Sequence, residues 1–184
     1  TPGESWDYTA TQHMILADLA FEDGKRKVLM QAPKNGFFYV LDRENGELLA
    51  ADAYVDVSWA SHVDLKTGRP VETGNADWSK DPKFVVPGPP GVHNWHPMSY
   101  NPETGWVYIP VLDIPANYAN DPAFRYRPDG PNLGTDGIIG GLPDSQAERD
   151  AMQSLVSGRL VAWASAFGAS SGCQRFSTTT TSGE

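Results

Sequence analysis

Two histidines and one cysteine are the residues that most directly suggest metal chemistry. His93 and His96 lie three residues apart, a spacing that can suit two metal ligands, but no third ligand lies nearby in the sequence. We therefore expect both histidines to be structural. Cys173 is the only cysteine, which excludes an intrachain disulfide, a cysteine-based zinc site and a Cys-x-x-Cys-His haem attachment within these residues.

Four other side chains stand in short motifs that could do chemistry: Asp7 in Trp-Asp-Tyr, Lys34 in Pro-Lys-Asn-Gly, and the pair Asn94 and Trp95 between the two histidines. A carboxylate can accept a proton or bind a divalent cation, and a lysine can stabilise negative charge on a bound group. An amide offers donors and an acceptor, and an indole packs on flat rings. Taken singly, however, an exposed turn aspartate and a solvated turn lysine are the simpler interpretations.

The composition bounds the kinds of partner. The chain has 184 residues, with 14 Lys+Arg against 23 Asp+Glu and a formal net charge of −9. That balance argues against a nucleic-acid partner and against docking on an anionic membrane surface, because no basic face is available to meet the phosphates. No run of about 18 apolar residues occurs, so we expect no segment to span a bilayer.

Short strands joined by turns are expected to position these side chains. Asn35-Gly36 separates two apolar runs, which is the strongest short signal for a β-hairpin. Three further turns place an Asp or Asn four residues before a Gly, at Asp42–Gly46, Asp64–Gly68 and Asn101–Gly105. A repeated strand–turn–strand unit favours an all-β propeller built from four-stranded blades.

The remaining segments complete the expected organisation. Residues 72–92 and 113–145 are rich in Pro, Gly, Asp and Asn and are predicted to be long irregular connections, whereas residues 145–156 predict one short helix. Strand character returns at residues 158–163. From 164 to 184 the strand–turn pattern is absent. We therefore expect residues 1–163 to form the propeller domain and residues 164–184 to be a divergent, disordered tail.

Four segments, in this order and spacing, resemble the quinoprotein alcohol dehydrogenases, the pyrroloquinoline quinone (PQQ) enzymes of the methanol/ethanol dehydrogenase family. They are WDYTATQ at 6–12, QAPKNGFFYVLDR at 31–43, GVHNWHPMS at 91–99 and GRLVAW at 158–163. The similarity covers roughly residues 1–163. It implies that the chain is an internal fragment, two to three blades of an eight-bladed β-propeller.

The resemblance also implies roles for the four side chains. Asp7 would be the general base that takes the alcohol proton and a ligand of the metal. Lys34 would contact the ortho-quinone oxygens of PQQ, and Asn94 and Trp95 would belong to the cofactor pocket. Thr9 stands where lanthanide-dependent relatives carry an extra Asp, so the implied metal is calcium.

The function that this resemblance implies is the oxidation of primary alcohols to aldehydes, with PQQ as cofactor and Ca²⁺ as Lewis acid. The implied partners are a small alcohol and a cytochrome or similar electron acceptor, the implied location is the periplasm, and a haem c domain is allowed outside these residues. A partial propeller exposes strand edges and apolar blade faces, so we expect this chain alone to be poorly stable. Further calcium ligands would lie before Thr1, so we expect it to be inactive alone. A non-catalytic propeller scaffold is the alternative, because fold does not imply function.

Overall fold

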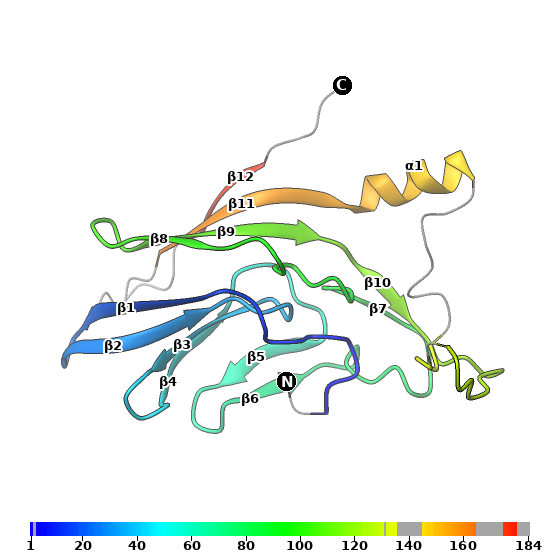
Figure 1. Cartoon of the computed structure of the whole chain (residues 1–184), viewed down its shortest axis with the longest axis horizontal. Coiled ribbons are helices and arrows are strands. Elements are labelled where there is room, and N and C mark those ends of the chain that lie inside the picture. The colour runs from blue at the N-terminus through cyan, green and yellow to red at the C-terminus, as the bar shows by residue number, and fades with distance from the viewer. Residues whose placement is uncertain (2, 131, 136–144, 165–174, 180–184) are drawn as a thin grey trace.

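The computed structural model describes residues 1, 3–130, 132–135, 145–164 and 175–179 (Figure 1). Two four-stranded antiparallel sheets dominate it. The first runs in chain order, with β1 (Met14–Phe21), β2 (Gly24–Gln31), β3 (Phe37–Asp42) and β4 (Leu48–Ala53). The second has the order β12-β11-β9-β8 and consists of β8 (Ser99–Asn101), β9 (Trp106–Asp113), β11 (Ser157–Ala164) and β12 (Arg175–Thr179).

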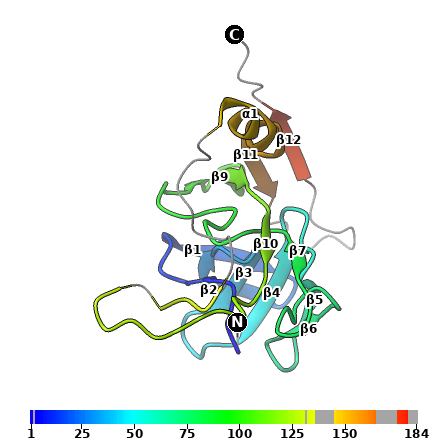
Figure 2. The same cartoon turned by 90° about the vertical axis from the view of Figure 1, so that its right-hand side faces the viewer.

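Two small antiparallel pairs and one helix complete the described elements. One pair joins β5 (Ala60–Asp64) to β6 (Arg69–Glu72), and the other joins β7 (Lys83–Val85) to β10 (Ala116–Tyr118). The helix α1 (Gln146–Leu155) begins at Ser145, whose hydroxyl accepts a hydrogen bond from the Glu148 N–H. Figure 2 shows β5 and β6 beside β4, and α1 next to β11 and β12. No helix in the described ranges is long and apolar enough to cross a membrane.

The repeated turns form as the sequence predicts. At Asp42–Gly46, Asp64–Gly68 and Asn101–Gly105 the glycine N–H donates to the carbonyl oxygen of the Asp or Asn, over 2.7–2.8 Å. Each of these glycines has a φ between +69° and +82°, a conformation that side chains other than Gly disfavour. The side-chain oxygen of the Asp or Asn also accepts an N–H from within the turn. The all-β expectation with one short helix is therefore confirmed.

Two sequence expectations need revision or stay open. The segments 72–92 and 113–145 are not wholly irregular, because each contributes one three-residue strand and these strands, β7 and β10, pair with each other. Their pairing joins positions more than 30 residues apart, which local composition does not reveal. The described part of the expected tail contains β12, which pairs with β11. The division at 163/164 stays a prediction.

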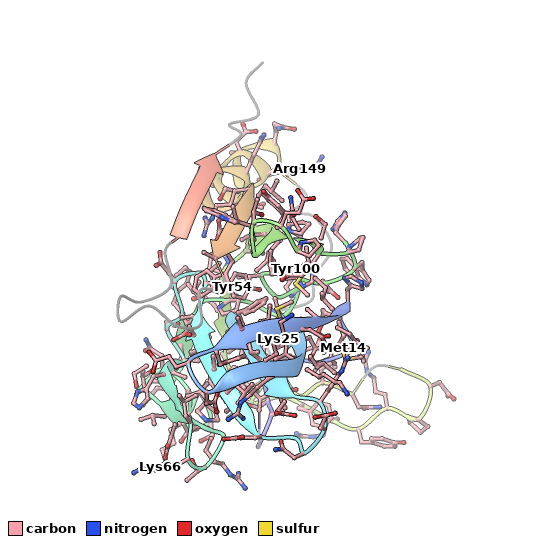
Figure 3. All side chains as sticks on the ribbon, turned by 90° about the vertical axis from the view of Figure 1, so that its left-hand side faces the viewer. Met14, Lys25, Tyr54, Lys66, Tyr100 and Arg149 are labelled. Atoms are coloured by element: carbon pink, nitrogen blue, oxygen red, sulfur yellow. The ribbon has the colours of Figure 1, made fainter. Side chains whose placement is uncertain are left out.

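The main core lies between the two four-stranded sheets. Buried side chains of β2 and β3 face those of β9 and β11, and Figure 3 shows the side chains that fill this space, including Tyr54 and Tyr100. Trp163 on β11 is 3% exposed, and its ring centroid lies 6.1 Å from that of Phe38 and 6.4 Å from that of Tyr54. One indole therefore ties the second sheet to the first.

A second core surrounds Trp59, which is fully buried. It gathers Trp6, Tyr8 and Phe37 with residues of β5, β7 and β10. This core brings the N-terminal segment against the start of β3.

We predict that Trp163→Ala in the complete gene product that carries this stretch lowers the free energy of unfolding by about 3–5 kcal/mol, because it leaves a cavity between the sheets. Trp163→Phe keeps an aromatic ring against Phe38 and Tyr54, so it serves as the control and should lose about half as much or less. Urea unfolding followed by circular dichroism measures both. Equal losses would show that Trp163 does not join the sheets by filling this space.

Candidate functional site

Asp7 lies in a tight loop between two buried aromatic residues. Trp6 and Tyr8 are buried and their rings stack at 5.5 Å, whereas the Asp7 side chain is 57% exposed. Asp7 has φ = +66° and is the one non-glycine residue with positive φ in the part of the chain that the structure describes. This conformation costs roughly 1 kcal/mol, although Asp tolerates it better than most residues. The loop thus holds an outward-facing carboxylate at some conformational cost.

The loop is anchored from distant elements. The Tyr118 hydroxyl on β10 donates to the Trp6 carbonyl oxygen over 2.8 Å, and the Trp6 indole N–H donates to the Ala76 carbonyl over 3.2 Å. The Tyr8 hydroxyl donates to the Pro87 carbonyl. Burial raises the pKa of Tyr8 and of Tyr118 well above the ordinary value, so both hydroxyls stay protonated and remain donors.

Lys34 reaches Asp7 from the loop between β2 and β3. Its Nζ donates to Asp7 Oδ2 over 3.1 Å and to the Asp7 backbone oxygen over 2.9 Å. The Lys34 side chain is 9% exposed, so its ammonium group has lost most of its contact with water and needs these partners. The structure therefore joins two of the residues that the sequence predicts to share a site.

The third motif packs directly on this lysine. The Val92 N–H donates to the Lys34 carbonyl oxygen over 3.2 Å, and a Cβ placed on Gly91 would lie 2.4 Å from the Cβ and Cγ of Lys34. His93 is buried, with its ring nitrogens against the backbone carbonyls of Ala32 and His96. His93 is therefore structural, as predicted, and fixes this loop against the β2–β3 loop.

Asn94 and Trp95 follow on the same loop. The Asn94 side chain accepts a hydrogen bond from Gln12 Nε2 over 3.3 Å and donates to the Pro90 carbonyl over 2.9 Å, which fixes the plane of its amide. Trp95 is 79% exposed, the highest exposure of any large hydrophobic side chain in the described residues. An oriented amide and an open indole face are the features that a flat polar cofactor needs. Hydrogen bonds link Lys34 to Asp7. The backbone hydrogen bond from Val92 to Lys34 connects Lys34 to the loop that carries Asn94.

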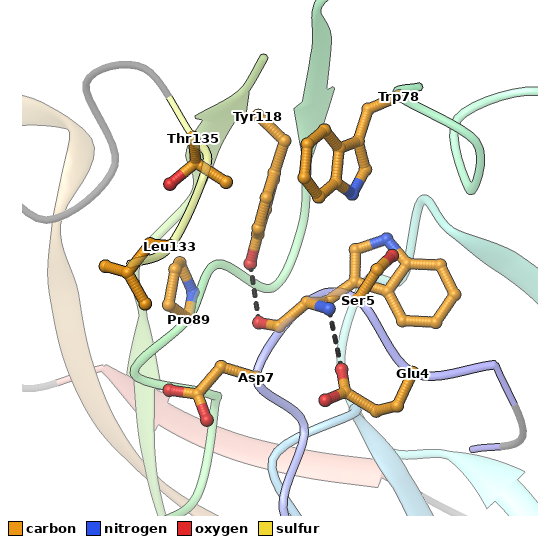
Figure 4. Close-up of a pocket in the computed structure, with 9 residues that line it drawn as sticks. Glu4, Ser5, Asp7, Trp78, Pro89, Tyr118, Leu133 and Thr135 are labelled. Carbon is orange, nitrogen blue, oxygen red and sulfur yellow. Dashed lines mark hydrogen bonds between the residues drawn. The ribbon is translucent and has the colours of Figure 1, made fainter. Parts of the chain in front are cut away.

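A hollow of about 490 Å³ opens beside Asp7 (Figure 4). Aromatic rings and the N-terminal loop form its walls; the lining residues are Glu4, Ser5, Trp6, Asp7, Trp78, Pro89, Tyr118, Leu133 and Thr135. The sequence did not indicate Glu4, Trp78 or Tyr118 as residues of the site. Glu4 stands three residues before Asp7, which is the one local signal that could have found it.

Asp7 is the residue that the sequence predicts to bind a metal ion. No group of three or more His, Cys, Asp or Glu residues within the described ranges is arranged to hold one. Calcium takes six to eight oxygen ligands, so Asp7 fits it as one ligand of a larger set. For PQQ, a cation, an oriented amide and an open indole lie on adjoining loops. Lys34, Asn94 and Trp95 do not line the hollow beside Asp7.

Comparison with known proteins shows which family the chain resembles. A family model described as PQQ, glucose/ethanol/alcohol dehydrogenase, β-propeller domain, matches residues 3–63, the range that contains Asp7 and Lys34. Over this range the chain is similar to the β-propeller domain of the PQQ-dependent dehydrogenases. The propeller resemblance expected from the four motifs is thereby confirmed.

Individual relatives extend the match over most of the chain. The quinohemoprotein alcohol dehydrogenase ADH IIB of Pseudomonas putida is 48% identical over 163 residues, which are 89% of this chain and 22% of that protein. The 1-butanol dehydrogenase (cytochrome c) of Thauera butanivorans is 40% identical over 166 residues, 89% of this chain and 23% of that protein. The chain thus spans less than a quarter of the length of these relatives.

Solved structures agree with this assignment. The quinohemoprotein alcohol dehydrogenase ADHIIG of Pseudomonas putida HK5 superposes with a TM-score of 0.83 at 44% identity, covering 96% of this chain and 26% of that one. A europium-containing methanol dehydrogenase gives a TM-score of 0.73 at 26% identity, covering 95% and 29%. The two four-stranded sheets are therefore part of a PQQ-enzyme propeller.

We predict that Gly91→Ala displaces Lys34. Its methyl group would overlap the lysine stem, so it should lower the free energy of unfolding by about 2–4 kcal/mol and expose the Lys34 amine. Gly46→Ala is the matched control: Gly46 also has positive φ, but a Cβ there meets nothing within 4 Å, so the cost should be about 1 kcal/mol. Thermal unfolding and the rate of Lys34 acetylation, read by mass spectrometry, measure the two effects. Equal acetylation in both variants would contradict the prediction.

Proposed function

We propose that the protein carrying this stretch is a PQQ-dependent alcohol dehydrogenase that oxidises primary alcohols to aldehydes. The observation that carries the proposal is the contact of Lys34 with Asp7 over 3.1 Å, which joins two residues whose motifs both lie in the family match. The relatives' names support an alcohol as substrate, and one of them names cytochrome c. A small alcohol and a cytochrome-type acceptor are therefore the proposed partners, and the periplasm is the proposed location.

Asp7 is the proposed general base. Its carboxylate faces the hollow, one of its oxygens bonds Lys34, and it can take the hydroxyl proton of an alcohol lying there. PQQ, when bound, supplies the two-electron acceptor for the alcohol carbon. Lys34 supplies positive charge beside the cofactor, Asn94 supplies a fixed amide, and Trp95 supplies an open indole face on which a flat ring can pack.

Calcium is the proposed metal, with Asp7 as one ligand. Thr9, two residues after Asp7, supplies no negative charge, which suits a divalent ion better than a trivalent one. The 184 residues alone are not expected to turn over alcohol, because Asp7 provides one ligand of a shell that needs six to eight.

Reconstitution tests this proposal. The complete gene product, incubated with PQQ and Ca²⁺, should gain quinone absorbance and reduce an artificial dye when primary alcohols are added. The same protein with the metal chelated, or without PQQ, should show no turnover. If the reconstituted protein reduces no dye with any alcohol or aldehyde tested, the enzymatic proposal fails and a propeller scaffold is the better description.

Single substitutions of Asp7 and Lys34 separate the roles of these two side chains. Asp7→Asn keeps the shape and the left-handed backbone but cannot accept a proton, so it should retain PQQ and lose alcohol turnover by about 100-fold or more. Lys34→Ala should weaken both cofactor retention and rate, because its charge acts in the ground state and the transition state. Lys66→Ala, at an exposed turn, is the control. Near wild-type turnover by Asp7→Asn with PQQ bound would show that Asp7 is not the base.

A further inference from the structure

The conformation of Asp7 needs a cause within its own loop. Asp7 has φ = +66°, and a side chain other than glycine keeps such a backbone only where its surroundings hold it. The rings of Trp6 and Tyr8 are anchored at their far ends, by Ala76 and Pro87, but these bonds do not fix the peptide groups on either side of Asp7. The Tyr118 hydroxyl bonds the carbonyl oxygen of the 6–7 peptide and Lys34 bonds that of the 7–8 peptide, so the N–H of the 7–8 peptide still needs a partner.

The Glu4 carboxylate meets this N–H, and it also meets the N–H of Trp6. Its Oε1 accepts the Trp6 N–H over 2.6 Å and the Tyr8 N–H over 2.9 Å, so a single oxygen bridges the residues before and after Asp7. Figure 4 shows Glu4 beneath the loop, with its hydrogen bond to the Trp6 backbone drawn. The two bonds close a ring of five residues with Asp7 at its outer side.

The peptide between Asp7 and Tyr8 links Glu4 to Lys34. Its N–H donates to Glu4 Oε1 over 2.9 Å, and its carbonyl oxygen accepts from Lys34 Nζ over 2.9 Å. Rotation of this peptide would break both bonds together. It would also move the Asp7 carboxylate relative to the ammonium group that it contacts.

We propose that Glu4 is a positioning residue for Asp7: its carboxylate oxygen, acting as a hydrogen-bond acceptor, holds the 7–8 peptide so that Asp7 and Lys34 stay in register. The catalytic consequence of this proposal rests on the proposed function, whereas the effect on the loop does not. The acceptor and not the charge is what the geometry requires, because both bonds go to the same oxygen and come from neutral N–H groups. Glutamine carries an equivalent acceptor oxygen.

Three variants of the complete gene product test the inference: Glu4→Ala, Glu4→Gln and the control Glu103→Ala, which removes an exposed glutamate from the turn between β8 and β9. Amide hydrogen exchange at Trp6 and Tyr8 is the first readout. It should become about tenfold faster or more in Glu4→Ala and stay near wild type in Glu4→Gln and Glu103→Ala.

Kinetics of the PQQ-loaded protein are the second readout. A misplaced base slows the chemical step, so Glu4→Ala should lower kcat by about tenfold or more, with the alcohol KM changed less than about threefold and the PQQ absorbance retained. Glu4→Gln should stay within about threefold of wild type in kcat. This rescue separates an acceptor role from a general loss of structure.

The outcomes separate the two proposals. Unchanged exchange at Trp6 and Tyr8 in Glu4→Ala would overturn the inference even if the protein oxidises alcohols. A Glu4→Gln variant as slow as Glu4→Ala would overturn it as well, because the charge would then matter. If the wild-type protein shows no turnover at all, the proposed function fails, and the exchange rates alone decide whether Glu4 holds the loop. If Glu4→Ala does not fold, Glu4→Gln with wild-type exchange and rate supports the inference.

Discussion

The ammonium group of Lys34 is the constraint on which the site depends. A charged group removed from water must find partners of its own, and Lys34 finds them in the carboxylate and backbone oxygens of Asp7. Asp7 must therefore lie where a lysine from the β2–β3 loop can reach it. Three features accompany this contact: Asp7 has a left-handed backbone, Glu4 bonds the peptide between Asp7 and Tyr8, and Gly91 approaches the Lys34 stem closely.

The two cores explain how the requirement is met. Around Trp59, the rings of Trp6 and Tyr8 bring the N-terminal segment against the start of β3. Between the sheets, the buried strands fix the ends of β2 and β3, and hence the loop that carries Lys34. Because close-packed interiors shift little, these cores let a few hydrogen bonds set the geometry of the exposed carboxylate.

Much of this architecture can be predicted from the sequence, because its determinants are local. The hairpin at Asn35-Gly36 and the three Asp- or Asn-capped turns depend on residues within five positions of one another, and they form as expected. Two other features do not depend on nearby residues. β7 pairs with β10 across more than 30 residues, and the hydrogen bond from Tyr118 to Trp6 joins residues 112 positions apart. Asp7 and Lys34 were found through their motifs, and one sequence cannot show which loops converge.

Glu4 could not be predicted from the sequence for a different reason, although it is only three residues from Asp7. Its side chain is exposed and forms no ion pair among the described residues, so by composition it is an ordinary surface glutamate. Its importance follows only from the positive φ at Asp7, which turns two neighbouring N–H groups toward a single oxygen. Asp at position 7 thus meets two demands together: its carboxylate can act as the proposed base, and its short polar side chain tolerates the left-handed backbone found at this position. A residue that met the first demand alone, such as Glu, would keep the charge and lose the geometry.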